Sequence, residues 1–210
     1  MSRSEESRGA PKRLLEKAAA FIPEGAVMPR AEAQALIAKI VAMSKADEIS
    51  VNINSGYQAD LRFAANQMST SGGVVNSQVA IQSTFGNKHA VAVTNDLSDA
   101  SLRRTVEQSE ALARLSPDDP ENMPALGSQT YVPVNGYFDS TANLSPDARA
   151  RAALTALEPA RKAGDLKAAG FIIVNASSTA LGNNKGLFAY SRATNANYTL
   201  TVRTEDGTGS

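Results

Sequence analysis

An alternation of apolar and polar side chains over much of residues 75–85 constrains the fold of this chain more than any other feature. Successive side chains of a β-strand point to opposite faces, so every second residue shares a face. The apolar set here is Val75, Val79, Ile81 and Phe85, and the polar set is Asn76, Gln78, Gln82 and Thr84. One buried face and one solvated face are typical of a strand in an antiparallel sheet.

Other segments predict further strands around this one. They cover residues 49–53, 61–63, 89–94, 171–174, 187–190 and 198–202. The first two segments would be paired strands joined at Ser55-Gly56, and Gly86-Asn87 would turn the chain from the 75–85 strand into the next one. Together they predict an antiparallel meander followed, much later in the chain, by three more strands.

Three helices are predicted between the strands. Residues 31–45 carry apolar side chains at helical spacing, Ser98 is an N-cap for a helix over 99–115, and Ser145-Pro146 starts a third helix that Pro159 should kink or end. Strands and helices thus occur in separate runs. This order predicts an α+β fold, with a mostly antiparallel sheet and helices packed on one side.

The chain divides unevenly. Residues 1–28, with one short helical candidate at 12–20, predict a loosely attached leader, and residues 29–210 predict one domain. A proline-containing connection over 116–145 should run across the surface of that domain. Residues 204–210 follow a predicted strand directly, without a closing helix, so we expect the chain to be interrupted there.

Composition excludes several classes of function. The chain has 210 residues, 21 basic and 21 acidic, with one histidine and no cysteine, which removes thiolate catalysis, Fe–S clusters and cysteine-rich zinc sites. Scattered basic residues give no concentrated positive field, so we expect no direct nucleic-acid partner. Without a long apolar run or a signal peptide, we expect no membrane segment and a cytoplasmic location.

His89 is the only candidate imidazole. A zinc site needs three or four converging ligands, so His89 would have to recruit carboxylates alone. A catalytic triad with Asp96 or Asp99 is formally open, but the sequence has no Gly-x-Ser-x-Gly segment to present the serine. A partly buried strand histidine is the favoured interpretation.

Four other segments have a chemical and a structural interpretation. Glu205 and Asp206 could act in acid/base chemistry, but adjacent strand residues face opposite ways, and a solvated turn is favoured. Residues 118–121 lack the spacing of a calcium loop, and 182–186 lacks that of a phosphate loop, so both are interpreted as turns. Arg62 could bind a peptide carboxylate or carbonyl, or be an ordinary exposed arginine.

Six segments in succession resemble the TldD/PmbA family, which was named for modulation of DNA gyrase and is regarded as a metalloprotease family. They are Leu61–Gln67, Val93–Ser98, Leu102–Arg104 leading into Ala111–Leu115, Ala169–Phe171, Asn184–Tyr190 and Thr201–Ser210. The resemblance implies a TldD/PmbA-like amino-terminal domain. Ala65 departs from the family, where a polar residue is frequent at that position.

The resemblance also implies a function for the whole subunit. Family members pair the amino-terminal domain with a carboxy-terminal domain that holds zinc on a His-Glu-x-x-x-His motif, which this chain lacks, so we expect no catalytic residue, no metal ligand and no cofactor here. The family cleaves peptides or unfolded proteins as homodimers or heterodimers. This chain would then supply dimer contacts and chamber walls, and Arg62, Asn66, Arg203 and Glu205 would contact substrate. The alternative is a stand-alone peptide-binding module that adds a strand to a sheet edge.

Overall fold

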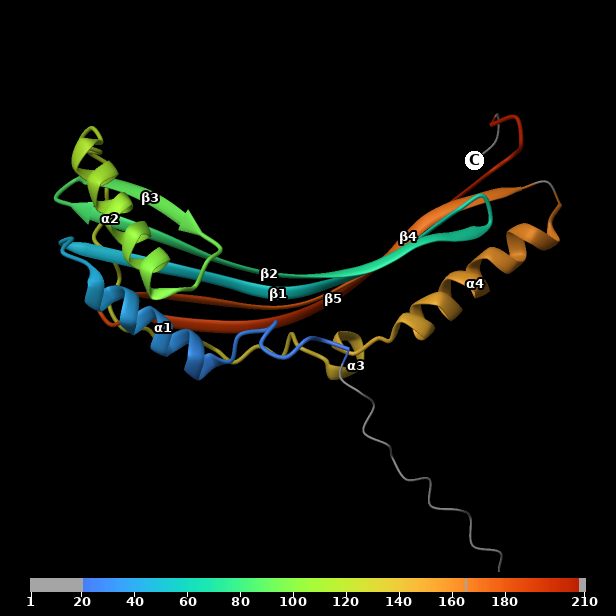
Figure 1. The fold of residues 1–210 in the computed structure, drawn as a ribbon, viewed down its shortest axis with the longest axis horizontal. Helices are drawn as coiled ribbons and strands as arrows, with labels where there is room; N and C mark the ends of the chain where they lie inside the picture. Colours follow the sequence, from blue (N-terminus) through green and yellow to red (C-terminus); the bar gives the residue numbers. More distant parts are fainter. Residues whose placement is uncertain (1–20, 165, 208–210) are drawn as a thin grey trace, which may run out of the picture.

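Four long strands and one shorter strand form a single arched antiparallel sheet in the computed structural model, which describes residues 21–164 and 166–207 (Figure 1). The strands are β1 (Glu48–Ala64), β2 (Gln67–Phe85), β3 (Lys88–Thr94), β4 (Lys167–Asn183) and β5 (Phe188–Arg203). Their spatial order is β3-β2-β1-β4-β5, and every neighbouring pair is antiparallel. No helix among the described residues is long and apolar enough to cross a membrane.

All of the longer helices cover the same face of the sheet. The helices are α1 (Arg30–Met43), α2 (Asp99–Leu115), α3 (Asp139–Ala142) and α4 (Pro146–Lys162). Alternate residues of β1 from Ile49 to Phe63 lie beneath them, and all of these except the half-buried Tyr57 are buried, whereas the residues between are partly or fully exposed. The predicted α+β fold, with a mostly antiparallel sheet and helices on one side, is confirmed.

The core consists of two clusters, one at each end of the arch (Figure 1). At one end, α1 and α2 pack on β1 and β2 through side chains that include Ile40, Val51, Ile81, Leu102 and Val106. At the other end, α4 packs through Ala153, Leu157 and Ala160 on Leu61, Phe63 and Ile172. Burial of a large aliphatic or aromatic side chain contributes about 1.5–3 kcal/mol, so each end has its own source of stability.

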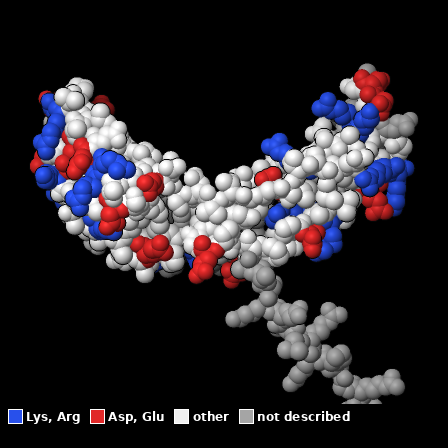
Figure 2. Space-filling model, viewed as in Figure 1, with Lys and Arg blue, Asp and Glu red and all other residues white. Residues whose placement is uncertain are grey.

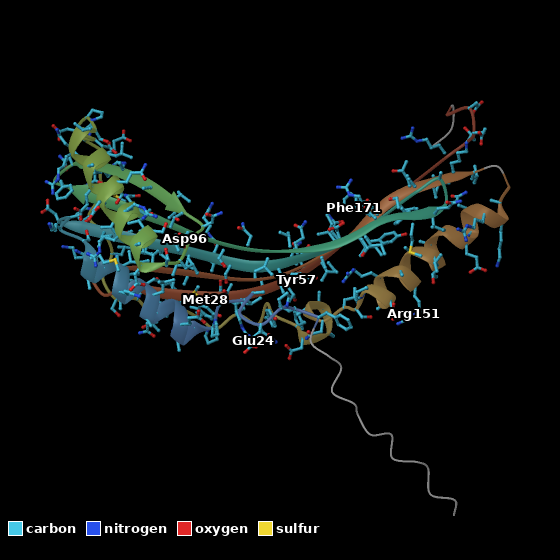
Figure 3. All side chains as sticks on the ribbon, in the orientation of Figure 1. Glu24, Met28, Tyr57, Asp96, Arg151 and Phe171 are labelled. Atoms are coloured by element: carbon cyan, nitrogen blue, oxygen red, sulfur yellow. The ribbon has the colours of Figure 1, made fainter. Side chains whose placement is uncertain are left out.

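Small and polar side chains occupy the sheet between the two clusters. Ser55 and Ser178 are buried there, with their Oγ atoms 3.0 Å apart. The Met28 N–H donates to Ser55 Oγ at 2.7 Å, so the segment before α1 is fastened under the middle of the arch (Figure 3). Ala26 and Met28 are buried at the end of the predicted leader, whose residues 1–20, including the helical candidate at 12–20, lie outside the described residues.

Replacing Ser55 with alanine is expected to destabilise the chain by about 1–3 kcal/mol, because the buried Met28 N–H loses its acceptor. Thermal unfolding followed by circular dichroism measures the effect. Ser177→Ala, one strand away on the opposite face of the sheet, is the matched control and should change the melting temperature little. Equal effects of the two substitutions would show that the hydroxyl of Ser55 is not what stabilises this region.

Several predicted elements are confirmed and others are corrected. The helices over 31–45 and 99–115 are α1 and α2, and the Ser98 side chain accepts from the Ser101 N–H as a cap. The 116–145 connection is irregular apart from the four residues of α3. The helix predicted to kink or end at Pro159 continues to Lys162, so the proline does not terminate α4.

The predicted strand breaks are wrong at two places. Residues 49–53 and 61–63 belong to one strand, β1, because Gly56 is extended and pairs with Asn76 and Ser177 instead of turning. A Cβ at Gly56 would lie 2.8 Å from the Ala176 carbonyl oxygen, so this glycine permits close packing. Likewise, the strands predicted at 187–190 and 198–202 are parts of one strand, β5, which begins at Phe188.

Candidate functional site

The hollow side of the arch is the face of the sheet that the helices leave open. Figure 2 shows that side chains without charge line most of this hollow. Its residues come from alternate positions of β1, β2 and β4, opposite in phase to the buried positions. Phe171 lies on this side, away from Met28 and the helices (Figure 3). The polar half of the alternation in the sequence therefore forms a continuous surface.

A cavity of about 330 Å³ lies at the centre of this surface. Its lining includes Asn54, Gly56, Gln58, Asn76, Asn175 and Ser177. Asn54 is held in place, since it donates to Asn52 Oδ1 at 2.7 Å and accepts from Thr179 Oγ1 at 2.9 Å. Among the described residues, the side chains of Gln58, Asn76 and Asn175 make no hydrogen bond. Amide groups both donate and accept, so these three can bond to a polypeptide backbone without selecting for charge.

The sequence predicts this surface only as solvated strand faces. Asn52, Asn54, Asn76 and Gln78 stand at the polar positions of the alternation, but nothing in their spacing along the chain indicates that β1, β2 and β4 align them across the sheet. The pairing of β1 with β4 joins residues more than 100 positions apart. A long-range contact of this kind leaves no local pattern.

Arg62 and Asn66 lie near the hairpin that joins β1 to β2. Arg62 is exposed on the open face, as its alternation with Leu61 and Phe63 predicts. Asn66 is bonded within the chain: its Nδ2 donates to the Leu166 carbonyl at 2.8 Å, and its Oδ1 accepts from the Ala168 N–H at 2.8 Å. The amide of Asn66 thus fastens the hairpin to the start of β4, with one hydrogen bond from Nδ2 and one to Oδ1.

Arg203 and Glu205 lie at the end of β5, at the same end of the arch as Arg62. Arg203 pairs in register with Lys167 and is exposed. Glu205 forms an exposed ion pair with Lys167 at 2.5 Å. Such a pair contributes between 0 and about 1 kcal/mol, so Glu205 could exchange it for another partner. The four predicted contact residues are therefore collected at one end of the sheet, outside the central cavity.

His89 lies beside the carboxylate of Asp119. It is half-buried, its Nδ1 lies 3.9 Å from Asp119 Oδ2, and this nitrogen has no hydrogen-bond partner in the structure. No group of three or more histidine, cysteine, aspartate or glutamate residues within 21–164 and 166–207 could hold a metal ion. The zinc that the family resemblance implies does not fit the residues described here.

The two aspartates considered for a triad are bonded elsewhere. Asp96 Oδ1 accepts from the Ser98 N–H at 2.9 Å, and this hydrogen bond lowers the pKa of the Asp96 carboxyl. Asp99 pairs with Lys39. Both carboxylates lie at the N-terminus of α2, where the helix dipole favours negative charge, and neither is bonded to His89.

The remaining candidate loops are turns. Asp119 Oδ1 accepts from the Glu121 N–H at 2.9 Å within the 118–121 segment. Asn183 Oδ1 accepts from the N–H groups of Lys185 and Leu187, which closes the turn at 182–186 ahead of β5. These hydrogen bonds support the structural interpretation of both segments.

Known proteins are similar to this chain in part of its sequence and in its fold. Residues 50–113 match the sequence profile of PmbA/TldA metallopeptidase domain 1. The fold is similar to that of TldE from Thermococcus kodakarensis, with a TM-score of 0.69 at 13% identity, over 82% of this chain and 43% of that chain. No curated protein matches the chain.

Two proposed modulators of DNA gyrase share the fold. The one from Thermotoga maritima has a TM-score of 0.67 at 14% identity, over 82% of this chain and 44% of that chain. The one from Bacteroides thetaiotaomicron has a TM-score of 0.71 at 13% identity, over 82% of this chain and 40% of that chain. The chain thus spans about two fifths of the length of these solved structures.

The arched sheet with its one-sided helices defines a known class of α+β domain. The resemblance to the TldD/PmbA family is confirmed, because residues 50–113 match the profile of its first domain and the fold is similar to that of TldE.

Proposed function

We propose that this chain supplies the amino-terminal part of a TldD/PmbA-like zinc metallopeptidase that acts on peptides or unfolded proteins in the cytoplasm. In this proposal it forms walls of the substrate chamber and contributes dimer contacts, and the zinc and the catalytic residues come from a carboxy-terminal domain. The observation that carries the proposal is the uncharged hollow of the arch, with its unbonded amides at Gln58, Asn76 and Asn175.

The chemistry of the hollow suits an extended polypeptide. An unfolded chain presents backbone N–H and C=O groups whatever its sequence, and side-chain amides can pair with both. A wall without strong charge neither repels nor traps charged segments, so substrates of many sequences can pass. Enclosure of the metal by a separate domain would also exclude folded proteins from the reaction.

The edges of the sheet support a role in assembly. The strand β5 is exposed along most of its 16 residues and carries no charged residue between Arg192 and Arg203. Apart from the hydrogen bond that the Thr194 N–H donates to the Gly136 carbonyl, the outer edge of this strand is a site for pairing with another chain. A related subunit, in a homodimer or a heterodimer, would cover such an edge in this proposal.

A mixing experiment tests the proposal. The purified chain alone should bind no stoichiometric zinc, measured by elemental analysis, and should not cleave casein or short peptides. Added to a full-length family member with an intact zinc motif, it should form a complex on size-exclusion chromatography and change the cleavage rate. Stoichiometric zinc together with cleavage by the chain alone would overturn the proposal.

Charge placed in the hollow tests the site itself. The double substitution Asn76→Asp and Asn175→Asp should lower cleavage of casein by the mixed complex, because two carboxylates in the cavity repel acidic substrates and remove two donors. Gln108→Glu on the exposed side of α2 is the matched control and should leave cleavage unchanged. If both variants cleave equally well, the hollow does not contact substrate.

The free edge of β5 also favours a second function. A stand-alone module could bind an extended peptide there by strand addition, without catalysis. The two functions differ in the mixing experiment, since a stand-alone module would bind peptides but leave the cleavage rate of a family member unchanged.

A further inference from the structure

A second and larger cavity lies at the edge of the sheet. Its volume is about 790 Å³. It lies between residues 129–137 of the long connection, the end of β4 and the start of β5. The connection touches the sheet edge at Gly136, whose carbonyl accepts from the Thr194 N–H at 2.9 Å. This cavity is separate from the hollow described above and shares only Thr179 with it.

The cavity carries positive charge without a counter-ion. Arg30 and Arg192 line it, and no aspartate or glutamate is among its lining residues. Within the described part of the chain, neither guanidinium group takes part in an ion pair. Two uncompensated arginines in one cavity favour an anionic ligand.

Aromatic rings hold both guanidinium groups in place. The Arg30 Cζ lies 5.2 Å from the ring centroid of Phe188, and the Arg192 Cζ lies 4.4 Å from that of Tyr137. Stacking occupies the face of a guanidinium and leaves its in-plane N–H donors free, and those donors match the two oxygens of a carboxylate. The arginines are therefore ordered for recognition of a planar anion.

The backbone of β5 offers a second type of contact in the same cavity. Alternate residues of an edge strand direct their N–H and C=O groups away from the sheet. The N–H of Thr194 points away from the sheet, toward the Gly136 carbonyl. The N–H of Arg192 and the backbone groups of Tyr190, at alternate positions of the same strand, therefore also point away from the sheet. An extended peptide lying beside Tyr190 could pair with them.

The connection supplies an apolar wall opposite this edge. Val132 and Val134 are 86% and 84% exposed, and Tyr131 is about half exposed, although all three line the cavity. No charged residue occurs between Glu121 and Asp139. Apolar or small side chains would be accommodated against this wall better than charged ones.

We propose that this cavity binds the carboxy-terminal end of an extended, uncharged peptide. Arg30 and Arg192 bind the terminal carboxylate, the outer edge of β5 pairs with the peptide backbone, and Val132 and Val134 contact its side chains. The inference goes beyond the chamber role, because a chamber wall has no need to recognise a chain terminus. It rests on the second function proposed above, strand addition at β5, and adds to it the end of the peptide that is bound and the arginines that bind it.

Binding of one peptide in two forms tests the proposal. The probe is fluorescein-labelled Ala-Val-Thr-Val-Ala, with either a free carboxy terminus or a carboxy-terminal amide, and fluorescence anisotropy reports its binding to the purified 210-residue chain. The acid should bind at least about tenfold more tightly than the amide, the difference expected for hydrogen bonds to a charged group. Equal affinity of the two forms, or no binding of the acid at millimolar protein, would overturn the proposal.

Variants locate the site. Arg30→Gln and Arg192→Gln together should abolish the preference for the acid, whereas Arg192→Lys should keep part of it. Arg103→Gln, at an exposed arginine of α2 outside the cavity, is the control and should leave the preference intact. If the control loses the preference as the double variant does, or if inorganic phosphate displaces the acid at equal concentration, the cavity does not recognise a peptide terminus. Failure of these measurements would leave the mixing experiment on the chamber role unaffected.

Discussion

Substitution of Gly170 with alanine is expected to destabilise the chain by about 3 kcal/mol or more, because the new methyl group has no space. A Cβ at this position would lie 2.0 Å from the Thr199 carbonyl oxygen and 2.7 Å from Cζ of Phe63. The first neighbour is backbone of β5, which no rotamer change can move. The melting temperature should fall by roughly 6–12 °C for a chain of this size.

Gly72→Ala provides the comparison. A Cβ at Gly72 would meet only Asp60 Oδ1, at the ordinary contact distance of 3.6 Å, so this substitution in β2 should be tolerated. Guanidinium chloride unfolding of both variants measures the difference in free energy. A loss at Gly170 no larger than that at Gly72 would mean that β4 and β5 can separate at little cost.

Asn66→Ala is expected to lower the free energy of unfolding by about 3 kcal/mol, for two reasons. The buried Ala168 N–H and the Leu166 carbonyl lose their partners, and alanine must adopt the positive φ of 62° that asparagine tolerates better. Asn66→Asp keeps the acceptor for Ala168 but not the donor to Leu166, so it should lose about half as much. Chemical unfolding of the three proteins tests this order.

Ala65→Gly is the control in the same turn. Ala65 also has a positive φ, 47°, and makes no side-chain hydrogen bond, so glycine should be neutral or stabilise by up to about 1 kcal/mol. If Asn66→Ala is as well tolerated as Ala65→Gly, the side chain of Asn66 does not fasten the hairpin, and its amide would be available to a ligand.

The hairpin at these two residues shows why part of the fold escapes prediction. A two-residue turn with positive φ is usually marked by Asn-Gly or Asp-Gly, whereas this chain uses Ala65-Asn66. Ser55-Gly56 carries the stronger turn signal, yet Gly56 lies in mid-strand, where the close Ala176 carbonyl requires glycine. A glycine that permits close packing and a glycine that turns the chain look the same in a sequence.

Helices were easier to predict than strands for a physical reason. Ser98 and Ser145 cap α2 and α4 through hydrogen bonds to residues three positions away, so the signal is local and visible. The middle of β5 is an exposed edge with little to bury on either face, and it shows no alternation between Ser191 and Asn197. Its extended conformation depends on pairing with β4, which the local sequence does not encode.

The candidate site follows the same rule. Arg62 is placed on the open face by the alternation of its neighbours, a local property. The cavity with Arg30 and Arg192 joins the start of α1 to β5, across more than 150 positions, and depends on the ring of Phe188 in β5 and on that of Tyr137 in the long connection. Its only sequence signal is a long uncharged connection, which predicts a surface loop equally well.

The polar stretch at Ser55 and Ser178 gives the arch a mechanical property. Each end is stiffened by helices packed on the strands, while no long helix within the described residues 21–164 and 166–207 packs against the span between them. We expect the sheet to bend mainly in this span, because small changes in strand twist there disturb neither core cluster. The distance between the two ends of the arch, and with it the width of the hollow, can change while both packed ends remain intact.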